Sequence, residues 1–260
     1  MFYSDGVNLM DSKILAAALF LPLFPLSILF NVLFEGLRKP LPRIVVLLAW
    51  PQIGAWLLQE ANSAPPDWAV HLALSTSLLY GFRALVLREL THWISFLAIS
   101  SWSLLWLIVG FFDNTEALHL LALGVSLPLA ILTLLGGQLE KKFGASYAGL
   151  YNGLGHAMPR FSGVFVFTIL AILATPVFPG FTTMTAAFLE VTKASLAGSI
   201  MLCLIWLTWG WAGSRLIQGF IIGKEHHEEI EDISSGLTWL YALILTGLAA
   251  FGIFTLGQLS

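Results

Sequence analysis

Long apolar runs separated by short polar breaks dominate the sequence. We predict eight membrane helices from these runs, because each approaches the roughly 20 residues that a helix needs to cross a bilayer core about 30 Å thick. Their approximate ranges are 13–36, 43–60, 67–88, 92–112, 117–137, 160–178, 186–219 and 236–257. The runs are solid apolar blocks, unlike the short alternating segments of a membrane β-barrel. The predicted fold class is all-α, a polytopic membrane helix bundle that forms one domain over 1–260.

The positions of the basic residues support this helix count. With the N-terminus placed outside, the loops alternate between two sides, and most of the 12 Lys and Arg residues fall on one of them. These residues are Arg38, Lys39, Arg43, Arg83, Arg88, Lys141, Lys142, Arg160, Arg215 and Lys224. The positive-inside rule makes that side the cytoplasm. We therefore expect both termini outside and an acidic cytoplasmic loop over 223–236, where a soluble partner could dock.

Composition excludes a water-soluble globular protein. Of 260 residues, 58% are hydrophobic and only 10% are charged, whereas a soluble domain usually has about a quarter charged residues. The net charge of −3 gives no reason to expect nucleic acid as a partner. We expect an integral protein of a bacterial inner (plasma) membrane, with the lipid bilayer as its first partner.

Motifs for self-contained enzyme chemistry are missing from the sequence. It has no glycine-rich phosphate loop, no nucleophile elbow, no HExxH zinc motif and no haem attachment motif. Its one cysteine, Cys203, cannot form a disulfide framework or a thiolate metal site. We therefore predict no cofactor, no metal and no enzymatic activity of the chain by itself.

The first candidate site is a discontinuous region near 175–187, marked by Pro176, Pro179 and Gly180. A broken helix within a membrane is tolerated where it is buried in protein or lines a wet cavity. Glu190 and Lys193 follow the break and, three residues apart, share a helical face on which they can pair. One interpretation is a proton relay or ion site beside a broken helix. The alternative is a turn outside the membrane, followed by the start of a helix that carries an ordinary acid.

Two histidines are further candidates for a proton path, because histidine can change charge near neutral pH. His71 lies about one turn into the third predicted helix, and His119 lies at the start of the fifth. The alternative for each is a histidine that is hydrogen-bonded to water or to a neighbouring helix. His226 and His227 are adjacent, so they lack the i,i+4 spacing of helical metal ligands, and we interpret them as part of a solvated loop.

The stretch 89–195 resembles the antiporter-like membrane subunits of respiratory complex I (NADH-quinone oxidoreductase) and of Mrp cation/proton antiporters, most of all the M-type subunit. The resemblance is carried, in order, by FLAISSWS (96–103), GVSLPLAILTLLGGQLEKKFG (124–144), NGLGHAMP (152–159) and FTILAILATPVFPGFTTMTAAFLEV (167–191). It implies that 89–195 corresponds to the C-terminal part of the antiporter-like fold. The opening run ILAAALFLPLFPLSILF is similar, more loosely, to the first helix of the family.

The chain departs from the family at the positions that carry protons. It is shorter, and the middle helices, with the family's essential Glu and Lys pair, are missing. The resemblance places further proton-carrying residues at Ala187, Val125 and near Leu104, all of which are apolar here. An apolar side chain carries no proton, so the resemblance implies a shortened and degenerate member.

Three functions are compatible with these features. The first is a membrane subunit of a multi-subunit, proton-coupled complex related to complex I or Mrp, either structural or contributing part of a proton path, with a full-length antiporter-like subunit as partner. The second is an autonomous proton or cation transporter, which needs Glu190 to titrate and the chain to oligomerise. The third is an accessory subunit of a proton-driven inorganic-carbon (CO2/bicarbonate) uptake complex.

Overall fold

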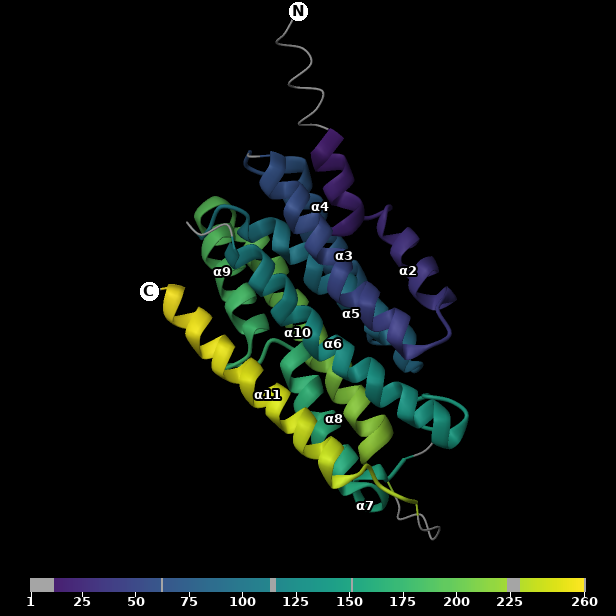
Figure 1. Cartoon of the computed structure of the whole chain (residues 1–260). Helices are drawn as coiled ribbons and strands as arrows, with labels where there is room; N and C mark the ends of the chain where they lie inside the picture. The colour runs from purple at the N-terminus through teal and green to yellow at the C-terminus, as the bar shows by residue number, and fades with distance from the viewer. Residues whose placement is uncertain (1–11, 62, 113–115, 151, 224–229, 260) are drawn as a thin grey trace, which may run out of the picture.

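The protein is a bundle of helices in a computed structural model that describes residues 12–61, 63–112, 116–150, 152–223 and 230–259 (Figure 1). Within these ranges it contains no β-strand, only an isolated bridge between Glu89 and Tyr147. Residues 12–20 form a first helical segment. The helices that follow are α2 (Ser27–Gly36), α3 (Pro40–Ala61), α4 (Asp67–Ala84), α5 (Leu90–Ser103), η1 (Leu104–Ile108), α6 (Glu116–Phe143), α7 (Leu154–Ala157), α8 (Pro159–Ile172), α9 (Pro179–Ala194), α10 (Leu196–Ile221), α11 (Ser235–Leu256) and η2 (Gly257–Leu259).

Five helices in this part of the chain are long and apolar enough to cross a membrane. They are Pro40–Ala61, Leu90–Ile108, Glu116–Phe143, Leu196–Ile221 and Ser235–Leu256. The all-α membrane bundle expected from the sequence is thus confirmed, and the protein is an integral membrane protein. The count of eight spans stays a prediction.

Two of the predicted helices are each divided in the structure. The first, 13–36, is interrupted over residues 21–26, where Pro22 and Pro25 lack the N–H that a helix interior needs. The amide of Phe24 in this gap donates instead to Thr76 Oγ1 on α4, at 3.0 Å. The segment 186–219 is divided at Ser195, whose backbone is extended and whose hydroxyl accepts from Gly198 N at 3.2 Å. Ser195 thus ends α9 and caps the start of α10.

Charged residues separate to the two ends of the bundle. We call one the basic end: there Arg43 Nη1 lies 3.8 Å from Glu140 Oε1, and Arg215 Nη1 donates to the carbonyl of Leu85 at 2.7 Å. The helix directions bring to this end the described members of the basic group predicted from the sequence, which are Arg38, Lys39, Arg43, Arg83, Arg88, Lys141, Lys142, Arg160 and Arg215.

The opposite end carries four acidic side chains and few basic ones, and we call it the acidic end. Glu60, Asp67, Glu116 and Glu190 lie there, together with Lys13, which pairs with Glu60 at 3.4 Å. The separation of charge that the sequence predicts is therefore present in the fold.

The core lies around α5 and η1, which are almost entirely buried among the other helices. Three tryptophans of this segment, Trp93, Trp102 and Trp106, are each at most 1% exposed. Trp102 Nε1 donates to Ser126 Oγ on α6 at 2.9 Å, and Trp106 Nε1 donates to the carbonyl of Leu21 at 2.9 Å. The segment 96–103, one of those that carry the resemblance to the antiporter family, thus lies at the centre of the packing.

Candidate functional site: a helix break and a cavity at the acidic end

The chain breaks between α8 and α9, over residues 173–178. Ala174 and Val177 have positive φ values of 54° and 78°, which residues with a Cβ adopt rarely. Pro179 begins α9, where its missing N–H removes no helical hydrogen bond. The predicted discontinuity is confirmed and narrowed: Pro176 lies in the turn, whereas Pro179 and Gly180 already belong to the second helix.

Glycines from three long helices surround this break. A Cβ added at Gly252 of α11 would lie 2.2 Å from Val177 O, and one added at Gly124 of α6 would lie 2.5 Å from Pro179 Cβ. At Gly213 of α10, the nearest atom is Leu173 Cδ1, at 2.5 Å. The break therefore packs against α6, α10 and α11 (Figure 1), while Pro176 and Val177 are exposed on its outer side. This favours a broken helix within the bundle over a turn outside it.

Side chains donate to three carbonyl groups at the break, of which those of Leu170 and Leu173 lie at the end of α8. Trp206 Nε1 donates to the carbonyl of Leu173 at 3.1 Å, and Thr175 Oγ1 donates to that of Leu170 at 2.9 Å. Thr183 Oγ1 donates to the carbonyl of Pro179 at 3.2 Å. An ion at the break would have to compete with these internal donors.

Glu190 and Lys193 pair as expected, but far from the break. Lys193 Nζ lies 2.8 Å from Glu190 Oε1, and the two side chains are 68% and 35% exposed, respectively. Glu190 follows Pro179 by eleven residues, which is about 16 Å along a helix. From the sequence, we expected the pair beside the break or at a helix start, because 186–219 was predicted as one helix. In the structure the pair lies in the last turns of α9, at the acidic end.

His71 and Glu190 line the same cavity, which has a volume of about 380 Å³. Asp67 and Ser195 also line it, and the other lining residues are mostly apolar. Two candidates that are 119 residues apart in sequence are thus brought together by α4 and the end of α9, with a second carboxylate beside them. A group of three or more His, Cys, Asp and Glu residues able to hold a metal is absent from the described ranges. The cavity is thus large enough to hold water, and it brings three ionisable side chains together at the acidic end.

His119 lies elsewhere, between two glutamines of α3. Its backbone carbonyl accepts from Gln52 Nε2 at 3.1 Å, and its Nδ1 lies 2.7 Å from Gln52 Oε1. Because a carbonyl can only accept, the Gln52 amide has a fixed orientation, and His119 Nδ1 must carry a proton. His119 Nε2 faces Gln59 Oε1 at 3.0 Å. The alternative in which His119 is hydrogen-bonded to a neighbouring helix fits this arrangement.

The three positions at which the resemblance expects proton carriers are buried and apolar. Ala187, Val125 and Leu104 are 0%, 7% and 1% exposed. Throughout the ranges that the structure describes, the polar residues classed as buried are all serine or threonine. One such pair, Ser77 and Ser100, exchanges hydrogen bonds between α4 and α5 at 2.7–2.8 Å, and Trp209 Nε1 donates to Ser100 Oγ at 2.8 Å. The core thus contains some polar side chains, and those described are uncharged hydroxyl groups.

One charged cluster was missed by the sequence analysis. His92 Nδ1 lies 2.8 Å from Glu89 Oε2, and His92 Nε2 lies 3.2 Å from Glu35 Oε1 on α2. The i,i+3 spacing of Glu89 and His92 is visible in the sequence. The third member, Glu35, could only be found from the packing of α2 against α5.

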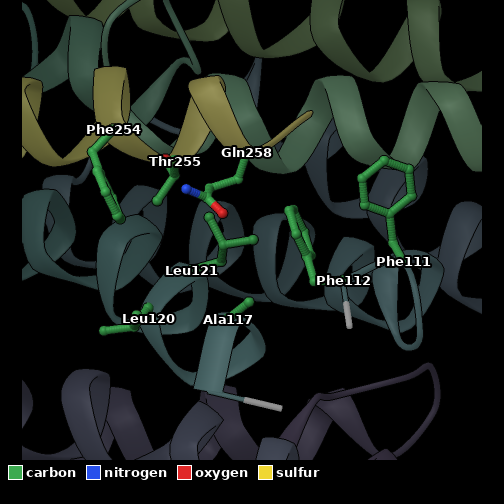
Figure 2. A pocket seen from close by; sticks show the side chains of 8 residues that line it. All are labelled: Phe111, Phe112, Ala117, Leu120, Leu121, Phe254, Thr255 and Gln258. Atoms are coloured by element: carbon green, nitrogen blue, oxygen red, sulfur yellow. The ribbon is translucent and has the colours of Figure 1, made fainter. Parts of the chain in front are cut away.

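A second cavity at the acidic end has a different lining. It has a volume of about 310 Å³, and Figure 2 shows Gln258 of η2 pointing toward Leu121 of α6 across it. The residues that line it are Phe111, Phe112, Ala117, Leu120, Leu121, Phe254, Thr255 and Gln258. Because none of these lining side chains titrates near neutral pH, this cavity is a poorer candidate for proton exchange than the one with His71.

The acidic loop 223–236 is partly outside the described residues, since His226 and His227 fall in 224–229. The described residues of this loop form hydrogen bonds with the start of α8. Asp232 accepts from Arg160 N at 2.7 Å and from Phe161 N at 3.1 Å, at the start of α8. At least one of the loop's acids therefore has a role inside the bundle.

Comparison with known proteins gives structural matches only. No family model matches the sequence, and no curated protein matches it. The fold matches a chain of respiratory complex I from Thermus thermophilus with bound NADH, with a TM-score of 0.78 and 18% identity over 96% of this chain and 58% of that one.

Two other complexes contain chains of the same fold. The Mrp complex from Dietzia sp. DQ12-45-1b matches with a TM-score of 0.70 and 16% identity, over 95% of this chain and 53% of that one. The membrane-bound sulfane sulfur reductase, an archaeal respiratory membrane complex, matches with a TM-score of 0.75 and 16% identity over the same shares. This chain spans a little more than half the length of each. The resemblance to antiporter-like subunits of complex I and Mrp complexes is thus confirmed at the level of the fold.

Proposed function

We propose that this protein is a structural, non-pumping membrane subunit of a multi-subunit complex of the complex I or Mrp type. The observation that carries the proposal is the burial of Ala187, Val125 and Leu104 where the resemblance expects proton carriers. A proton path through a membrane needs titratable groups or water at short intervals. Apolar side chains packed in a core supply neither.

The hydroxyl groups of the core fit the same function. Ser77, Ser100 and Ser126 hydrogen-bond to backbone or to tryptophan, and thereby join neighbouring helices. Hydrogen bonds of this kind stabilise membrane helix contacts without a hydrophobic driving force. They hold the bundle together, and they do not exchange charge near neutral pH.

The exposed apolar faces of the bundle are available to partners. Trp56 on α3, Leu207 on α10 and Leu243 on α11 are 54%, 65% and 71% exposed. In a membrane such faces are covered by lipid or by other subunits. We propose a full-length antiporter-like subunit as the principal partner, with the basic end at the cytoplasm, both termini on the other side and a bacterial inner membrane as the location. A soluble partner at 223–236 belongs to the same proposal.

An autonomous proton or cation transporter is a second candidate, favoured by the cavity of His71, Asp67 and Glu190. In that function the cavity would be an entrance at the acidic end. A continuation through the core would have to come from a second copy of the chain, because the buried polar residues described here are hydroxyls.

Substitutions of two residues that line the cavity, and of Lys193, which pairs with Glu190, distinguish the two functions. Glu190→Gln, Lys193→Ala and His71→Gln are introduced separately, with Glu60→Gln as a control at the same end and outside the cavity. If the subunit is structural, the variants leave the parent complex assembled in mild detergent, and its proton transport in vesicles, followed with a pH-sensitive dye, is unchanged. Proton transport by the purified chain alone that is lost in Glu190→Gln would overturn the structural function and establish the second candidate.

A further inference from the structure

A groove of about 680 Å³ runs along α8 and α11. It extends from Arg160, at the basic end, to Pro176 and Val177 in the helix break. Most of its lining is apolar, with Val164, Phe167 and Leu245 among the lining residues. We call it the α8–α11 groove.

The groove opens on the outer surface of the bundle. Phe167 and Val177, which line it, are 59% and 43% exposed. A Cβ added at Gly163, which also lines it, would have no atom within 4 Å. In an integral membrane protein this opening faces lipid or another subunit.

The length of the groove matches one leaflet of a bilayer. The 14 residues of α8 rise about 21 Å, which is about half of the roughly 40–45 Å thickness of a bilayer with its headgroup regions. The groove begins at the basic end and stops at the break, so it has the depth of a single lipid tail.

A cationic side chain lies at the mouth of the groove. Arg160 is exposed, and its guanidinium has no hydrogen bond or ion pair within the part of the chain that the structure describes. The carboxylate of Asp232 nearby accepts from the amides of Arg160, Phe161 and Ile233 at 2.7–3.1 Å, and no ion pair joins it to the guanidinium. Arginine presents several donors in a fork that suits phosphate oxygens.

We propose that the α8–α11 groove binds an anionic phospholipid from the leaflet at the basic end, with one acyl chain in the groove and its phosphate on Arg160. The tail would cover Pro176 and Val177, which the break leaves exposed. The position of one cation at the headgroup end of a one-leaflet apolar groove favours a lipid over a transmembrane helix of a partner, which would need no charge at this point.

Native mass spectrometry of the full chain in mild detergent tests the proposal. Dioleoyl-phosphatidylglycerol and dioleoyl-phosphatidylcholine are titrated separately, so that the tails are the same and only the headgroup differs. We expect about fivefold tighter binding of the anionic lipid, since one surface arginine contributes about 1 kcal/mol to anionic-lipid attraction. Arg160→Gln should abolish this preference, whereas Arg38→Gln, a basic-end control outside the groove, should keep it.

Substitutions that fill the groove test separately whether it binds the acyl chain of the lipid. Gly163→Leu should weaken the binding of both lipids, and Thr246→Leu fills the same groove should the first variant not fold. Gly210→Leu on α10, where an added Cβ also meets nothing within 4 Å, should bind lipid as the unmodified chain does. Unchanged binding in both groove-filling variants, or a lipid preference that persists in Arg160→Gln, would overturn the proposal. So would a photo-crosslinker at position 163 that labels a protein in native membranes in place of a lipid.

Discussion

The indole Nε1 of Trp206 on α10 donates a hydrogen bond of 3.1 Å to the carbonyl oxygen of Leu173, the residue that follows α8. Leu173 is 6% exposed, so this oxygen cannot rely on water. The helix break thus depends on a donor from another helix, and the contact makes the break testable by substitution.

Trp206→Phe should destabilise the protein by about 1–3 kcal/mol, because it leaves a buried carbonyl without a donor. Thermal unfolding in detergent measures the loss. Trp211→Phe on the same helix is the matched control, since Trp211 is 60% exposed, and its substitution should have little effect. Equal effects of the two substitutions would show that loss of the hydrogen bond to Leu173 does not account for the destabilisation.

Gly252→Ala should be among the most damaging small substitutions in the chain. The added Cβ would lie 2.2 Å from Val177 O and 2.6 Å from Phe178 C, both of which are backbone atoms that cannot rotate away. We expect a loss of at least about 1–3 kcal/mol, the usual cost of overpacking, measured as a lower melting temperature and lower yield. Gly247→Ala, on the same helix with open space around the added Cβ, should be tolerated. Normal stability of Gly252→Ala would mean that α11 can move away from the break without loss of stability.

Ala187→Lys introduces a charge of the kind that the resemblance expects near this position, and we expect it to be harmful. Ala187 is 0% exposed, and a charge without a partner in such a site costs several kcal/mol. Folded yield in membranes is the measurement, with Thr192→Lys at the exposed end of α9 as the control. A well-folded Ala187→Lys protein that gains proton transport in vesicles would contradict the structural function proposed here.

Asp232→Ala should shorten the ordered start of α8. The carboxylate accepts from Arg160 N and Phe161 N, which are free N–H groups of the first turn, and removal of such a cap costs about 1 kcal/mol. Hydrogen exchange at residues 160–163 and thermal unfolding measure the effect. Glu231→Ala changes the neighbouring acid, whose backbone carbonyl, and not its side chain, accepts from Lys142 Nζ. Faster exchange in both variants would indicate that the charge of the loop matters more than this cap.

The fold class could be predicted from the sequence because lipid imposes long apolar helices with charged ends. The break near Pro179 was predictable for a similar reason, since proline removes a backbone donor wherever it lies. The end of α9 at Ser195 was not found, because a single serine between two apolar runs is a weak signal until its hydroxyl is seen to accept from Gly198 N.

The candidate site was only partly predictable. The sequence indicated His71, Glu190 and Lys193 because they are ionisable residues in apolar surroundings. The pairing of Glu190 with Lys193 follows from their spacing of three residues. That His71 and Glu190 line one cavity depends on how α4 and α9 each pack against α10. The bridge from Glu35 to His92 likewise joins two helices, and spacing within one helix cannot reveal it.

The neutral core has a consequence for how the protein responds to an energised membrane. A transmembrane voltage acts on charge, by about 2.3 kcal/mol for each elementary charge moved through 100 mV. Over the described ranges, the buried polar residues are serines and threonines, which offer this field no net charge to move. A transmembrane voltage would therefore exert no net force on these buried side chains, which is what the proposed structural function requires.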